Sequence, residues 1–140
     1  MNAITLWQPW AWAVAHAGKD VENRGWQPPL RAIGHPLAIH AGQNCDLLAV
    51  LHLHEMGLRE APATASGYPR GAVVAVAILG GAIGPYSGPS GYWHERGSWG
   101  WKLVKIRTLT IPVHCRGHQG IWTLPPDVEA AVRTQLEAVA

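Results

Sequence analysis

Apolar positions along the chain follow two periods, one typical of strands and one typical of helices. Short runs bounded by Gly or Pro predict strands, and apolar residues spaced by three and four predict helices. The predicted strands cover 3–6, 21–26, 37–40, 72–79, 101–109, 111–113 and 120–124. The predicted helices cover 9–17, 44–56 and 126–139, with Pro9 in the first helical position, Asn44 as an N-cap and an amphipathic C-terminal helix. Gly- and Pro-rich stretches at 61–71 and 80–100 predict loops.

Helices and strands are interspersed without the regular alternation of a doubly wound sheet. This order predicts an α+β fold with a mixed, curled sheet. The length of 140 residues predicts one domain, 1–140.

Composition excludes several classes of protein. The chain is 48% hydrophobic and 14% charged, which excludes a disordered chain. The longest apolar run, 72–79, is too short to cross a membrane, and no secretory leader is recognisable. With two cysteines and no disulfide framework, we expect a cytoplasmic protein. A net charge of +2 does not by itself indicate nucleic-acid binding. Eight tryptophans with no phenylalanine, however, indicate that some of the tryptophans line a groove.

Six short segments carry a more specific signal through their order and spacing. They are LWQPWA (6–11), KDVENR (19–24), PLAIHA (36–41), GAVVAVA (71–77), GW (100–101) and GHQGIWTLP (117–125). Together they resemble the ASCH domain family, one of the PUA-like β-barrels, over about residues 4–125. The most specific pieces are Gln-Pro-Trp-Ala and Lys-x-x-Glu-x-Arg.

The resemblance implies a PUA-like mixed β-barrel of five to six short strands flanked by about three helices. It also implies a cleft between the first helix and the next strand that binds RNA or other nucleic acid, and some members act on nucleosides. Two departures stand out. The family's glycine has moved next to Lys19, and members that cleave N4-acetylcytidine carry Thr where this chain has Glu22. Their second carboxylate aligns with Ile78, which argues against the deacetylating reaction.

Three charged residues are the first candidates for binding. Glu22 and Arg24 share one face of an extended strand, and Lys19 lies in the preceding turn. Arg24 and Lys19 could grip a phosphate, while Glu22 could orient Arg24, read an exocyclic amine or act as a base. The alternative is a solvated salt bridge on a hairpin.

Aromatic and polar neighbours complete the predicted binding residues. Trp7 and Trp26 are candidates for stacking a base, whereas Trp10 lies on the predicted buried stripe and is interpreted as core. Gln8 opens a helix whose free N–H groups could form an anion site. His40 is expected to face the cleft, or else to be a strand-end histidine bonded to backbone.

The remaining histidines do not predict a metal site. His52 and His54 would point to different faces of a helix, and His114, Cys115 and His118 do not complete a four-ligand zinc site. No metal or cofactor is therefore expected. The loop at 92–99 could be a lid over the cleft or a self-packed loop. The residues at 102–116 form the densest basic stretch, which could track phosphates or be an ordinary solvated face.

Three functions stay open. The first is a module that binds RNA or single-stranded nucleic acid. The second is a hydrolase of RNA phosphodiesters or a modified nucleoside, with Lys19 and Glu22 as acid and base partners. The third is a reader of a modified base. The expected ligand is RNA, single-stranded nucleic acid, or a nucleotide or nucleoside. No interaction with a membrane is expected.

Overall fold

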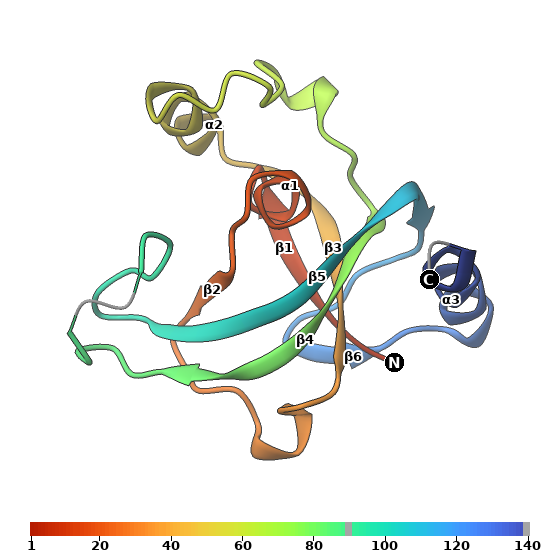
Figure 1. Cartoon of the computed structure of the whole chain (residues 1–140). Helices are drawn as coiled ribbons and strands as arrows, with labels where there is room; N and C mark the ends of the chain where they lie inside the picture. The colour runs from red at the N-terminus through yellow and green to blue at the C-terminus, as the bar shows by residue number, and fades with distance from the viewer. Residues whose placement is uncertain (89–90, 139–140) are drawn as a thin grey trace.

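The computed structural model describes residues 1–88 and 91–138, and it contains one mixed sheet with helices around it (Figure 1). The strands in chain order are β1 (Asn2–Gln8), β2 (Val21–Arg24), β3 (Pro36–Cys45), β4 (Ala72–Ile83), β5 (Trp99–His114) and β6 (Ile121–Thr123). The helices are α1 (Trp10–His16), α2 (Leu47–Glu55) and α3 (Pro126–Ala138), with short 3-10 turns at Leu30–Ala32 and Ala65–Gly67. The predicted α+β class is confirmed.

The sheet has six strands in the order β2-β5-β4-β3-β1-β6. β1 and β3 are parallel, and the other neighbouring pairs are antiparallel. Three shifts of register between β4 and β5 bend this long pair, and Figure 1 shows both strands curving around α1. Within the described residues no strand pairing joins the two edges, β2 and β6, so a closed barrel is not confirmed.

Two hydrophobic clusters cover the two faces of the sheet. On the inner face Ile4, Ile39 and Leu103 pack with Ala11 and Val14 of α1. On the outer face, residues that adjoin Ile4 and Ile39 in the sequence pack with α3. Adjacent strand residues therefore reach opposite faces, as the period of two requires. α1 contacts β1, β3, β4 and β5, which holds it inside the curl of the sheet.

Several element boundaries differ from those predicted. β5 is one strand where two were predicted, because a residue with positive φ, Lys105, and shifts of register interrupt its alternation without ending the pairing. Asp46, not Asn44, caps α2, since its carboxylate accepts from the N–H groups of Leu48 and Ala49. Asn44 remains in β3. α1 begins at Trp10, one residue after Pro9.

Across the described part of the chain, no helix combines the length and the apolar character needed to cross a membrane.

Candidate functional site

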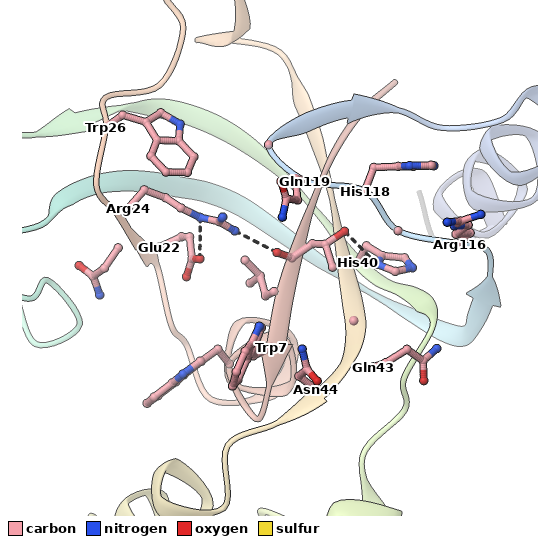
Figure 2. Close-up of a pocket in the computed structure, with 17 residues that line it drawn as sticks. Trp7, Glu22, Arg24, Trp26, His40, Gln43, Asn44, Arg116, His118 and Gln119 are labelled. Carbon is pink, nitrogen blue, oxygen red and sulfur yellow. Dashed lines mark hydrogen bonds and ion pairs between the residues drawn. The ribbon is translucent and has the colours of Figure 1, made fainter.

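The site lies where the curved sheet stays open. β6 pairs with β1 only at Asn2–Ile4, so β1 has no strand partner on that side from Thr5 onward. β2 faces this free stretch, and Arg24 Nη2 donates to the Thr5 carbonyl over 3.0 Å. A cavity of about 850 Å³ occupies this gap and is called the main pocket below (Figure 2). Its walls come from β1, β2, the end of β3 and the segment 116–120.

Lys19, Glu22 and Arg24 form one chain of charged groups. Lys19 Nζ is 3.0 Å from Glu22 Oε1, and Arg24 Nε is 3.1 Å from Glu22 Oε2. Gly18, at a φ of +71°, makes the left-handed turn after α1 that brings Lys19 beneath β2. The sequence pattern therefore predicted three groups that the fold does bring together.

The three groups differ in their access to the pocket. Lys19 is 3% exposed, also donates to the Val21 carbonyl, and does not line the main pocket. Arg24 does line the main pocket. Glu22 lines it too, and among the described residues it is the one carboxylate in the lining. Both oxygens of Glu22 accept from cations, so its first role is to orient Arg24. Lys19 and Arg24 stand on the two sides of Glu22 rather than in one cavity.

Two exposed tryptophans border the main pocket. Trp7 and Trp26 are 55% and 52% exposed, although indole rings are usually well buried. In Figure 2 the Arg24 and Glu22 side chains lie between them. The Nε1–H of Trp101 donates to the Trp26 carbonyl over 2.8 Å, which fixes the backbone that carries this ring.

Trp10 is not a core residue, contrary to the prediction. It is only partly buried and lines the main pocket, and its ring lies 5.8 Å from Lys19 Nζ. The first turn of α1 sits at the mouth of the curled sheet, while the buried residues of the helix are Ala11, Ala13 and Val14. A cation close to an aromatic face is an attractive contact, which helps to compensate for burying Lys19.

Gln8 is buried and performs a structural task. Its Oε1 accepts from the Trp12 N–H over 2.9 Å, and its Nε2 donates to the Pro69 carbonyl over 2.7 Å. One of the free N–H groups at the start of α1 is thereby satisfied internally. Gln8 is not among the residues that line the main pocket.

His40 forms part of the pocket wall from a buried position. Its Nε2–H donates to the Cys115 carbonyl over 2.8 Å, and Nδ1 lies 3.2 Å from Thr5 Oγ1, which itself accepts from Trp122 Nε1. Since a carbonyl only accepts, the proton sits on Nε2 and the Thr5 hydroxyl donates to Nδ1. Burial lowers the pKa of His40, which keeps the ring neutral. The structure therefore places His40 in the backbone-bonded arrangement.

Glycine is required where the segment 116–120 meets His40. A Cβ on Gly117 would come within 2.6 Å of His40 Cε1 and 2.7 Å of Thr5 Oγ1. The close approach of this backbone closes one side of the main pocket. It gives a physical reason for glycine in the Gly-His-Gln-Gly segment.

Several polar residues of the main pocket were missed from the sequence. Two amides, Gln43 and Asn44, come from the end of β3, and Gln119 comes from the opposite loop. Exposed Arg116 and His118 complete that side. Isolated amides leave no periodic signal, and only the Gly-His-Gln-Gly segment marked this loop. The basic stretch contributes a single residue, Arg116, to the pocket.

A second cavity adjoins the first. This side pocket has a volume of about 670 Å³ and shares Trp10, Glu22 and Asn23 with the main pocket. Its outer wall is the segment 92–95. Asn23 holds that segment through two hydrogen bonds of 2.9 Å, donating to the Trp93 carbonyl and accepting from the Glu95 N–H. Lys19 lines this second cavity.

Among residues 1–88 and 91–138, no group of three or more His, Cys, Asp or Glu side chains is arranged to hold a metal ion. The main pocket instead offers hydrogen-bond donors and acceptors beside aromatic faces.

A six-stranded curved sheet around a short first helix is the fold that this chain shares with solved ASCH proteins. The chain is similar to the ASCH protein of Zymomonas mobilis at 15% identity and a TM-score of 0.61, over 95% of this chain and 93% of that one. Two single-substitution variants of that protein match at 16% identity over 95% of this chain, with TM-scores of 0.58 and 0.59. They are covered over 96% and 94% of their lengths. No protein-family model matches the chain, and no curated protein matches it significantly. At such low identity the likeness shows the fold, and the predicted ASCH resemblance is confirmed at that level.

Proposed function

We propose that this chain is an ASCH-family protein that binds RNA or single-stranded nucleic acid in the main pocket. The ASCH fold supports the proposal, since proteins of the PUA-like class generally bind RNA. The observation that carries it is the pair of half-exposed tryptophans, Trp7 and Trp26, beside the guanidinium of Arg24. Aromatic faces that stack bases and cations that meet phosphates are the two components of single-strand recognition.

The polar lining suits a nucleobase. Gln43, Asn44 and Gln119 each offer a carbonyl acceptor and an amide donor, which can pair with the edge of an unpaired base. The volume of about 850 Å³ is that of a small-ligand site and accommodates a nucleotide rather than a duplex. The main pocket therefore favours an unstacked base with its phosphate.

Charge sets the expected strength of binding. Two guanidiniums, Arg24 and Arg116, and one carboxylate, Glu22, line the main pocket. With about two phosphate contacts, the logarithm of the affinity should fall with the logarithm of salt concentration at a slope near −1.4. Arg24 is already oriented by Glu22 and Thr5, so it meets a phosphate at little cost in side-chain entropy.

Fluorescence titration with short RNA oligomers across a salt series tests the proposal. Arg116→Gln should reduce the slope by about 0.7, because one phosphate contact is lost. Trp26→Ala should weaken binding about tenfold and leave the slope unchanged. Trp12→Phe is the matched control, since Trp12 lines neither pocket. Absence of binding at low salt, or equal slopes for the wild type and Arg116→Gln, would contradict the proposal.

A hydrolase remains the second candidate, favoured by the buried Lys19 ammonium 3.0 Å from Glu22. Acid–base work on a nucleoside or phosphodiester would use this pair, in which Lys19 donates and Glu22 accepts. Both Glu22 oxygens are engaged by cations and Ile78 does not line the main pocket, so binding is the better supported function. Product formation that Lys19→Gln abolishes would establish the hydrolase.

The barrel of the PUA-like class is part of the same proposal. We propose that the curved sheet is an incompletely closed barrel whose seam lies between β1 and β2. The Arg24–Thr5 hydrogen bond spans that seam in place of a strand ladder. The open seam then supplies the room that the main pocket occupies.

A further inference from the structure

We propose that the side pocket is a second base subsite, so that the protein binds two consecutive nucleotides rather than one. The inference rests on the proposed function of the main pocket. It assigns to the side pocket a neutral, amino-bearing nucleobase next to the nucleotide in the main pocket.

Continuity between the two cavities carries the first step. Trp10, Glu22 and Asn23 line both, so one ligand can reach across them without leaving the surface. A volume of about 670 Å³ is large enough for a nucleoside. The two volumes are similar, as expected for two units of the same polymer.

The lining of the side pocket matches a planar base. Trp10, Trp93 and Tyr92 supply aromatic faces, and Met56 supplies a flexible apolar side chain. The rings of Tyr92 and Trp93 are packed edge to face with their centres 5.3 Å apart. Trp10 and Trp93 are half-buried and Tyr92 is exposed, which suits stacking better than core packing.

Charge distinguishes the two pockets. Two guanidiniums and one carboxylate line the main pocket, whereas one ammonium and two carboxylates, Glu22 and Glu95, line the side pocket. The Lys19 ammonium already donates to Glu22 and to the Val21 carbonyl. The Glu95 carboxylate makes no hydrogen bond or ion pair to any described residue, and it can only accept. The side pocket therefore disfavours a phosphate and favours the exocyclic amino group of a base.

The outer wall is positioned before any ligand arrives. Asn23 bonds to the backbone of Trp93 and Glu95, and His94 Nε2 lies 2.8 Å from the Ser98 carbonyl. A wall fixed in this way loses little conformational entropy on binding. Asn23 lies in β2 between Glu22 and Arg24, which line the main pocket, so the strand serves both pockets.

Calorimetric titration with the mononucleotides pA and pU and the dinucleotides pApA and pUpU tests the inference. The wild type should bind pApA about tenfold more tightly than pA, with a gain of threefold or less from pU to pUpU. Trp93→Ala should remove the gain for pApA and leave binding of pA unchanged. Glu95→Gln, which keeps the backbone bond to Asn23, should lower the gain about threefold. Tyr86→Ala is the control, an exposed aromatic residue that lines neither pocket.

Two kinds of result would contradict the second subsite, and they differ in what they imply for the main pocket. Equal affinity for pA and pApA, or a gain that Trp93→Ala and Glu95→Gln both preserve, refutes the second subsite while the main pocket keeps its function. A failure to bind any of the four probes refutes the proposed function and the second subsite together.

Discussion

Glu22 is the residue on which the organisation of the site depends. Its two oxygens accept from a buried ammonium on one side and a guanidinium on the other. A single carboxylate thus compensates the charge of Lys19 and sets the direction of Arg24. Because these charges are removed from water, the two ion pairs are stable only while Lys19, Glu22 and Arg24 are all present.

Glu22→Gln should destabilise the fold by about 3 kcal/mol, the usual cost of breaking a buried ion pair from one side. The glutamine presents one oxygen and turns its NH₂ group towards a cation. Urea unfolding measures the difference in unfolding free energy. Arg133→Gln is the control, because Arg133 is half exposed and its pair with Glu129 should be worth no more than about 0.5 kcal/mol. Equal losses for the two variants would refute the central role of Glu22.

His40 predicts how stability depends on pH. Burial lowers its pKa below the ordinary value of 6.5, so the unfolded chain binds the proton more readily than the folded one. The contribution of His40 to the stability of the fold is complete above pH 6.5, and it is lost as the pH falls through the lower pKa of the folded state. Urea midpoints between pH 8 and pH 5 should therefore decline in the wild type, and His40→Gln should flatten that decline. His118, whose electrostatic interaction with His40 also lowers the pKa of His40, stays in both proteins. An identical decline in both would refute this role of His40.

Residue types and spacing predicted part of the site. The period of two placed Glu22 and Arg24 on one face, and the preceding turn brought Lys19 to them. The burial of Gln8 and the only partial burial of Trp10 were not predictable, because both depend on where α1 meets the mouth of the curled sheet. Gln43, Asn44 and Gln119 converge only through the tertiary fold.

At the scale of elements, β2 is short but is tied to three parts of the molecule. It pairs with β5, reaches β1 through Arg24 and holds the segment 92–95 through Asn23. Its four residues therefore position both pockets.

Asn23→Ala should loosen the 92–95 segment, because two hydrogen bonds to its backbone are lost. Each such bond is worth about 1 kcal/mol, so hydrogen exchange of this segment should accelerate roughly tenfold or more. Exchange measured by mass spectrometry gives the result, with the peptide covering β3 as the internal reference. Unchanged protection at 92–95 would show that other contacts hold the wall.

Element types were more predictable than element ends. Apolar periodicity located the helices and the strands, but it divided β5 into two strands, and β4 continues to Ile83 into the predicted loop. Gly80 and Gly81, near the end of β4, interrupt the apolar pattern, so the pattern does not predict this extension of the strand. Their pairing with β5 is fixed by long-range hydrogen bonds instead.

At the scale of the whole molecule, the curvature of the sheet and the gap between β1 and β2 create the site. The mixed α+β class followed from the order of elements, whereas the gap did not. Its position depends on β6 stopping at Ile4 of β1 and on the bent β4–β5 pair bringing β2 opposite Thr5. Neither feature has a local sequence signature.

The indole Nε1–H signals of the eight tryptophans provide the most direct test that the main pocket binds nucleic acid. Each signal can be assigned with a single Trp→Phe variant and followed by NMR as short single-stranded RNA is added. We predict saturating shifts for Trp7 and Trp26, which border the main pocket, and none for Trp12 and Trp99, which line neither pocket. Shifts confined to Trp12 or Trp99, or an unchanged spectrum at low salt, would contradict the assignment of this pocket to nucleic acid.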